Sequence, residues 1–296
     1  MELLVWLFPL GERSRARLVE LLPASRLVFK SGRCALPVSD PLLPRVLAGG
    51  DGFWVAGQSV FSRSELSRFR HFEAVCRRVV PEGKRDHEKN LATVEATPKF
   101  GPDGTAGIRL VRGFVLTRIT LKPNVVAAIG GWTNECVVGS EVAQAVREAG
   151  FSGFQLLPVT HPKTGVPYAD FSHLFTEAIL PPATLDPSVE TIRSRFPEEN
   201  GALRHLGCLS YAAGDLYQRP DFNRSAEPWA SWWGFPSWVV SARVAALFKR
   251  AKLSGWHFRP VLEVGSATYD QYLRSWQELA QHVAEGEKTT FDGGRW

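Results

Sequence analysis

The chain lacks the short motifs by which most enzyme families are recognised. It has no G-x-S-x-G, no G-x-x-x-x-G-K-[ST] and no G-x-G-x-x-G sequence, so the serine-hydrolase, P-loop and dinucleotide-binding signatures are absent. Its seven histidines form no HExxH or HxH pair with metal-ligand spacing. We therefore predict no catalytic triad, no metal, no cofactor and no enzymatic activity.

Cysteine is also scarce. The four cysteines, Cys34, Cys76, Cys136 and Cys208, stand far apart and form no CxxC pair, which argues against a disulfide framework or a zinc site. Free thiols are typical of a reducing compartment, so we expect the protein in the cytoplasm.

Long apolar runs are missing as well. No segment approaches the roughly 20 apolar residues that a membrane span needs. The first residues are apolar over only about eight positions, without a basic start or a small-residue cleavage site. We expect neither a signal peptide nor a membrane partner.

Charge of one sign does not dominate the chain. The net charge is +5 and the pI is near 9.1, with 22% charged and 44% hydrophobic residues, which is the composition of a folded globular protein. Basic residues are scattered among acids, and the densest cluster, Lys84–Lys89, contains both signs. Signatures of DNA- and RNA-binding domains are absent, so nucleic acid is not an expected partner.

What the chain does contain is an internal repeat. Residues 137–159 (VVGSEVAQAVREAGFSGFQLLPV) and 239–261 (VVSARVAALFKRAKLSGWHFRPV) align without a gap, and nine of the 23 aligned positions are identical. Neither copy contains a nucleophile, a metal-ligand cluster or a phosphate-binding loop. The repeat is therefore interpreted as a packing unit, which points to a scaffold or binding protein.

Each copy has the pattern of a strand end, a helix, a turn and a second strand. Val142, Ala145, Val146 and Ala149 follow helical spacing, and the second copy repeats this stripe. A Ser-Gly pair predicts the turn, and a proline is expected to close the strand. We predict two related helix–turn–strand units within a mixed-sheet assembly, of α+β or mixed α/β class.

The remaining elements are predicted from shorter patterns. Strands are expected at Glu2–Phe8 and Phe53–Val60, and helices at Arg13–Leu22 and Ser266–Val283. The capping box at Ser62–Glu65 predicts a helix that continues to Pro81.

Proline and glycine predict two irregular stretches, at residues 31–50 and 162–187, and residues 108–121 are expected to supply one or two strands. We divide the chain into an N-terminal α/β region (1–100), a C-terminal region with the repeat (101–285) and a mobile tail (286–296).

Tryptophan is concentrated in one place. Four of the ten tryptophans lie between residues 229 and 238. Protein interfaces use Trp and Arg as anchors, so the candidate partner-binding residues are Arg224, Trp229, Trp232 and Trp233. The alternative is that these rings cover the core over an irregular connection, with Arg224 pairing with Asp221 or Glu227.

A small-molecule site is the competing hypothesis. His173 stands among aromatic residues beside Glu177, and a pocket lined by His173, Glu177 and His257 between the two repeat-bearing halves would indicate an enzyme or a ligand-binding protein. Ser210 is a further candidate nucleophile, whereas we expect Cys208 to be a small buried apolar residue.

Several segments resemble bacterial immunity proteins, which protect a cell from the polymorphic toxins of its own lineage. They are Phe222-Asn223-Arg224, Glu227-Pro228, Trp238–Ser241 and Leu253–Val261. The likeness is greatest to the myxobacterial family named for a double CxxCG motif, to which Phe100-Gly101-Pro102 and Leu180-Pro181-Pro182 are also similar. It covers residues 50–265, but this chain has no CxxCG, so any zinc knuckle of the family is missing here.

The resemblance implies a non-catalytic cytoplasmic protein that binds one cognate toxin and neutralises it, and no catalytic residues carry over. Immunity proteins against nucleases are usually acidic, because they mask a basic active site. A net charge of +5 therefore favours a toxin of another class or an allosteric block.

Overall fold

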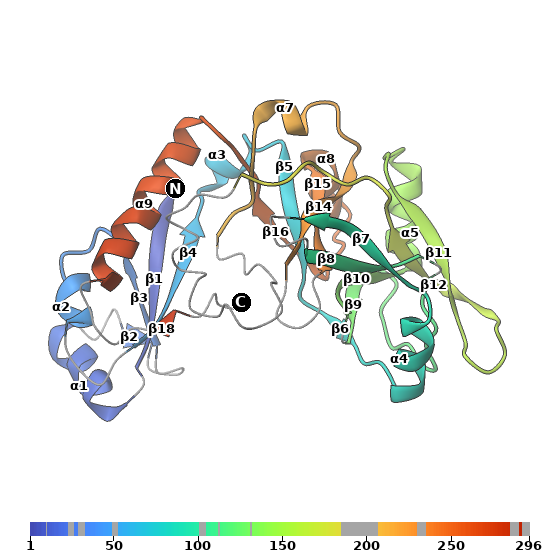
Figure 1. Ribbon diagram of the computed structural model, residues 1–296, viewed down its shortest axis with the longest axis horizontal. Coiled ribbons are helices and arrows are strands. Elements are labelled where there is room, and N and C mark those ends of the chain that lie inside the picture. The colour runs from blue at the N-terminus through green and yellow to red at the C-terminus, as the bar shows by residue number, and fades with distance from the viewer. Residues whose placement is uncertain are drawn as a thin grey trace.

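A computed structural model of the chain contains two bodies joined through the middle of the molecule (Figure 1). It describes residues 1–9, 11–22, 27–28, 33–48, 53–100, 105–111, 113–130, 132–184, 207–229, 235–284 and 290–291. These residues form both helices and several sheets, which confirms the predicted mixed α+β class.

The first body is a five-stranded sheet with the strand order β18-β4-β1-β3-β2. All neighbouring strands are antiparallel except β4 and β18. The strands are β1 (Glu2–Pro9), β2 (Leu27–Val28), β3 (Arg33–Pro37), β4 (Phe53–Val60) and β18 (Thr290–Phe291). The helices packed with them are α1 (Glu12–Leu21), α2 (Leu43–Leu47) and α9 (Ala267–Ala284).

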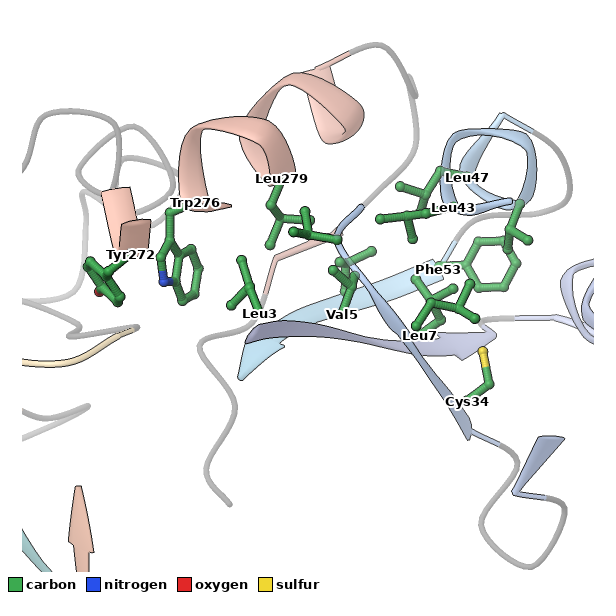
Figure 2. Packing of buried hydrophobic residues seen from close by; sticks show 14 of the residues in the cluster. Leu3, Val5, Leu7, Cys34, Leu43, Leu47, Phe53, Tyr272, Trp276 and Leu279 are labelled. Carbon is green, nitrogen blue, oxygen red and sulfur yellow. The ribbon is translucent and has the colours of Figure 1, made fainter. Parts of the chain in front are cut away.

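The core of this body lies between β1 and α9. Leu3, Val5 and Leu7 alternate with half-buried residues along β1; Leu3 and Val5 lie below α9, and Leu7 lies below α2 (Figure 2). Gly57 of β4 allows the helix to approach closely, because a Cβ atom there would lie 2.6 Å from the Trp276 ring. Strands from the start of the chain and a helix near its end thus share one core.

The second body contains two larger sheets with the orders β11-β12-β10-β9-β6 and β14-β15-β5-β16. The strands of the first are β6 (Val79–Val80), β9 (Val126–Ile129), β10 (Trp132–Gly139), β11 (Gln155–Thr160) and β12 (Pro167–Phe175). Those of the second are β5 (His71–Cys76), β14 (Phe222–Trp229), β15 (Phe235–Ser241) and β16 (Trp256–Pro260). Read from the strand that follows each repeat helix, the first sheet has the order β11-β12-β10-β9 and the second has the order β16-β5-β15-β14. Each of these strands therefore has a counterpart in the other sheet.

Each sheet carries one helix of the repeat. Helix α5 (Ser140–Glu148) follows β10, and α8 (Ala242–Arg250) follows β15. Their buried residues, such as Val142 and Val244, join Cys136 and Trp238 of the two sheets in a single core. The apolar stripes of both repeat segments therefore pack in the same place.

The two sheets exchange a strand. β5 precedes β9, β10, α5 and β11 in the chain, yet it pairs with β15 and β16. β12 precedes the second set and pairs with β10 and β11 of the first. The register is the same in both, since Val137 pairs with His173 where Val239 pairs with Glu73.

The chain crosses back after each exchanged strand. Val79 pairs in parallel with Ala128 of β9, and Ile179 pairs in parallel with Arg224 of β14. Each repeat segment thus forms its sheet with a strand, β5 or β12, that precedes the other repeat segment in the chain. Order of elements and strand register agree in the two repeat segments; that the segments are copies of one unit stays a prediction.

The described part of the chain also contains smaller elements. They are α3 (Arg63–Leu66), α4 (Lys84–Leu91), the hairpin β7 (Val94–Phe100) and β8 (Thr105–Leu110), the parallel pair β13 (Ser210–Tyr211) and β17 (Leu262–Glu263), and α7 (Ala213–Leu216).

The repeated Ser-Gly turn has a steric reason. Gly255 has φ +99°, and a Cβ atom on it would lie 1.8 Å from the Val126 carbonyl oxygen. Gly153, with φ +81°, would bring a Cβ atom within 2.6 Å of the Phe222 carbonyl oxygen. In each case the glycine turn passes against the first residue of a strand in the other sheet, Val126 of β9 or Phe222 of β14, where no side chain fits.

One predicted helix is wrong beyond its first turn. The capping box is present, with the Glu65 amide donating to Ser62 Oγ at 3.2 Å. However, α3 ends at Leu66, and residues 71–76 form β5 instead. Phe72 and Ala74 are buried in the core between the sheets, so pairing with β15 and β16 overrides the helical spacing.

Residues 31–50 were predicted to be mostly loop, and this is wrong, because β3 and α2 occupy much of the described stretch. Residues 162–187 were predicted to be largely irregular; β12 lies within them, and the described residues on either side of it, 162–166 and 176–184, belong to no helix or strand. Among the described residues of 108–121, a strand contains 108–110 alone, in β8. Pro260 does end β16, but Pro158 lies inside β11, at the edge of its sheet, where a missing N–H is tolerated.

Strands and helices from either side of residue 100 share sheets and cores, since β5 pairs with β15 and α9 packs on β1. The division at that residue stays a prediction about independent folding. In the predicted mobile tail, Thr290 and Phe291 pair with β4; its other residues lie outside the described part of the chain.

We predict that Gly255→Ala lowers the free energy of unfolding by about 3 kcal/mol or more, because left-handed strain adds to a clash with backbone. Gly165→Ala is the matched control: Gly165 also has positive φ, but no atom lies within 4 Å of the added Cβ. The control should lose only about 1 kcal/mol. Urea unfolding of both variants measures this, and equal losses would contradict the close approach of the two sheets.

Candidate partner-binding site

The tryptophan-rich segment connects β14 to β15. These strands pair from Phe222 and Val240 out to Trp229 and Phe235, with an irregularity after Arg224. The candidates Trp232 and Trp233 lie outside the described residues, and Trp229 is described by its backbone alone. The described part of the site is therefore the base of this hairpin.

The hairpin is longer than its counterpart in the other sheet. In β9 and β10, paired Ala128 and Cys136 are separated by residues 129–135; in β14 and β15, paired Arg224 and Trp238 are separated by residues 225–237. Cys136 and Trp238 each stand directly before a copy of the aligned repeat. The second hairpin thus carries six extra residues, and the tryptophan cluster falls in this longer connection.

Arg224 holds the base of the hairpin from inside. Arg224 is buried, with 6% of its surface exposed. Nη1 donates to the carbonyl oxygens of Asn134 (2.7 Å) and Pro236 (2.9 Å), and Nη2 donates to Glu135 Oε2 (3.0 Å). The guanidinium plane lies 3.8 Å from the centre of the Trp238 ring. One side chain therefore links β14 and β15 to β10 of the other sheet.

Glu135 completes this buried group. Its Oε2 also accepts a hydrogen bond from His173 Nε2 at 3.0 Å, and both side chains are essentially unexposed. Trp238 Nε1 donates to the Asn134 carbonyl oxygen at 2.8 Å. A buried charge is tolerated only where it is paired and hydrogen-bonded, as Arg224 and Glu135 are.

A second polar group fixes the outer face of β15. Ser237 Oγ donates to Glu73 Oε1 at 2.9 Å, and the Ser237 amide donates to Ser225 Oγ at 2.8 Å. Arg259 of β16 pairs with Glu73 at 2.6 Å. The hairpin is thus tied to both β5 and β16.

Asp221 anchors the start of β14. Its carboxylate accepts hydrogen bonds from Ser241 Oγ (2.6 Å) and from the Ser152 amide (3.1 Å). Arg243, whose side chain is 64% exposed, pairs with it at 3.3 Å. Asp221 was one expected partner of Arg224, and this prediction is wrong, because Arg224 points to β10 while Asp221 binds Ser241 at the start of α8 and Ser152 in the turn after α5.

The inward position of Arg224 could have been read from the sequence. Phe222 and Arg224 stand two residues apart, so they share one face of a strand, and Phe222 is a natural core residue. The partner Glu135 lies 89 positions away, and no local pattern indicates it.

The residues of the competing pocket hypothesis do not form one site. His173 is fully buried beside Phe114, with ring centres 4.7 Å apart, whereas Glu177 and His257 are exposed. A cavity of about 670 Å³ lies elsewhere, between the residues before and within α4 and residues 117–120. Among the described residues no group of three or more His, Cys, Asp or Glu is placed to hold a metal.

The Cys208 thiol is buried, as expected, and burial raises its pKa to about 12. At neutral pH the sulfur is therefore protonated. The neighbouring Ser210 is also buried, and its hydroxyl donates to the Cys208 carbonyl oxygen at 3.5 Å.

Comparison of the chain with models of known protein families and with curated proteins finds no match. None of the described helices is long and apolar enough to cross a membrane.

We predict that Arg224→Ala lowers the free energy of unfolding by about 3–5 kcal/mol, because Glu135 would remain buried without its cation. Arg224→Lys should recover part of this loss, since it keeps the charge but not the planar fork. Arg243→Ala, which breaks an exposed pair, should cost about 1 kcal/mol or less. Chemical denaturation distinguishes these cases; an Arg224→Ala variant as stable as Arg243→Ala would refute the buried anchor.

We predict that Cys208 resists alkylation by iodoacetamide at pH 8 in the folded protein, because thiolate is the reactive form and its pKa is far above that pH. Unfolding in urea should expose it and restore the reactivity of a free thiol. Peptide mass mapping reads the labelled site, and rapid native labelling at Cys208 would contradict the described burial.

Proposed function

We propose that this protein is an immunity protein, which binds a cognate bacterial toxin in the cytoplasm and neutralises it without catalysing a reaction. The observation that carries the proposal is the tryptophan-rich extension of the β14–β15 hairpin on an internally anchored base. The resemblance of residues 222–228 and 238–261 to immunity proteins supports the same function.

A large aromatic extension on a fixed base suits tight protein binding. Trp and Arg contribute a large share of the energy at interface hot spots. Association also costs the entropy of ordering loops, and a hairpin whose base is already held by Arg224, Ser237 and Asp221 loses less of it. Trp229, Trp232 and Trp233 are the proposed contact residues, and Arg224 is proposed to act as their support.

The charge of the chain restricts the class of toxin. Inhibitors that cover the basic active site of a nuclease benefit from negative charge. With a net charge of +5, this chain is better suited to a toxin with an acidic surface. We therefore expect either a toxin that is not a nuclease or inhibition at a surface away from the toxin's active site.

We predict that Trp232→Ala and Trp233→Ala each weaken toxin binding by about 2 kcal/mol or more, with little change in melting temperature. The toxin is expected among the products of neighbouring genes, and capture of that product by the tagged chain identifies it. Titration calorimetry then gives the affinities. Tyr217→Ala, which removes an aromatic side chain that is 67% exposed outside the hairpin, is the control and should bind as the parent does.

Two different results would count against this. Stable Trp232→Ala and Trp233→Ala variants that bind as tightly as the parent would remove the hairpin from the interface. Failure of the parent chain to bind or inhibit the neighbouring toxin would refute the immunity function itself.

A further inference from the structure

Three segments meet at one junction of the second body, where the chain leaves β5, enters β9 and leaves α8. The Arg77 amide donates to the Gly255 carbonyl oxygen (2.8 Å), and the Val126 amide donates to that of Ser254 (2.9 Å). The Ala128 amide donates to the Arg78 carbonyl oxygen at 2.9 Å. Residues 77–78, 122–128 and 250–257 are therefore neighbours in space.

Five exposed cations stand on these segments. We call them the basic junction: Arg77, Arg78, Lys122, Arg250 and Lys252. Within the described part of the chain, none of their side chains makes an ion pair or a hydrogen bond. Their charges are left available to another molecule.

The pKa of His257 depends on its burial and on the charges around the basic junction. Its pKa is lowered to about 4, first by desolvation of the ring and then by the positive charges of Arg77 and Arg259. No carboxylate acts on this histidine strongly enough to offset them. At neutral pH the His257 ring is therefore uncharged and adds no charge to the junction.

The other half of the molecule provides an internal comparison. There the Phe222 amide donates to the Ser152 carbonyl oxygen (3.2 Å) and the Arg224 amide to that of Ala178 (2.8 Å), as Val126 and Ala128 do at the basic junction. The positions that correspond to Arg77, Arg78, Arg250 and Lys252 are Glu177, Ala178, Glu148 and Gly150. They carry two acids and no base, so the fold itself does not require cations here.

Helix capping does not explain the cluster either. A base in the last turn of α8, such as Arg250, interacts favourably with the helix dipole. Lys252 follows the helix with φ 52°, and Arg77, Arg78 and Lys122 belong to no helix. Most of the cluster has no role in stabilising an element.

We propose that the basic junction docks against an acidic surface of a folded protein partner. Val79, which is 64% exposed, adjoins Arg78 and adds an apolar contact of the kind that protein interfaces contain. No Phe, Tyr or Trp among the described residues of the three segments is exposed to stack on nucleic-acid bases. That this partner is the toxin rests on the proposed function; the docking surface itself does not.

The test compares two triple variants of equal net charge. Arg77→Gln/Arg78→Gln/Lys252→Gln removes part of the basic junction. Arg45→Gln/Arg63→Gln/Arg68→Gln removes three exposed cations from elsewhere on the chain. Both sets replace exposed side chains, so melting temperatures should match the parent. The probes are poly-L-glutamate, as an acidic polypeptide, and duplex DNA, each titrated at several salt concentrations.

The junction variant should bind poly-L-glutamate at least about tenfold more weakly than the control variant at low salt, with a shallower salt dependence. Equal losses in both variants would show attraction by net charge alone and overturn the proposal. A loss confined to duplex DNA would also overturn it, in favour of a nucleic-acid site. Lys122→Gln/Arg250→Gln repeats the comparison from the other side of the junction.

With the toxin in hand, the junction variant should slow association, whereas Trp232→Ala should speed dissociation. Unchanged association by the junction variant would refute the junction as the toxin's docking surface and leave the immunity function standing. Absence of toxin binding by the parent would refute the immunity function, while the result with poly-L-glutamate would still decide the docking surface.

Discussion

The buried charge pair between Arg224 and Glu135 is the interaction on which the candidate site depends. Placing a guanidinium and a carboxylate in the interior is costly unless their hydrogen-bonding groups find partners. The partners here come from both sheets: Asn134 and Glu135 lie on β10, and Pro236 and Trp238 lie on β15. The pair therefore fixes the two hairpins to each other at the end where the tryptophan-rich connection leaves the core. The described base of the β14–β15 hairpin is thus held by contacts within the protein itself.

The exchange of β5 and β12 between the sheets places the Arg224–Glu135 pair in a shared interior. Neither half contains all the strands of its own sheet, so the two sheets form one packed unit around α5 and α8. Where the halves agree, as in the glycine turns at Gly153 and Gly255, the residue is required by the close approach of backbones. The longer β14–β15 hairpin and the basic junction are two places where the halves differ, and both proposals concern them.

Local patterns in the sequence predicted what depends on local chemistry. The mixed class, the α5 and α8 stripes, the capping box at Ser62 and the final helix all follow from spacing and turn residues, and the structure has them. Pairing between segments far apart in the chain could not be predicted from these local patterns. Phe69, Phe72 and Cys76 fit a helical stripe, and only the pairing of β5 with β15 and β16 decides for the strand. The same limit hid the contact of Arg224 with Glu135, because its two residues lie in different hairpins.

The central proposal is that the partner binds at the extension of the β14–β15 hairpin. Hydrogen–deuterium exchange of the chain, alone and with the captured toxin, tests it most directly, because amides covered by a partner exchange more slowly. The account predicts new protection in peptides that span residues 227–236, while peptides from β1 and α9 stay unchanged. Strong protection elsewhere, with none in that hairpin, would contradict it.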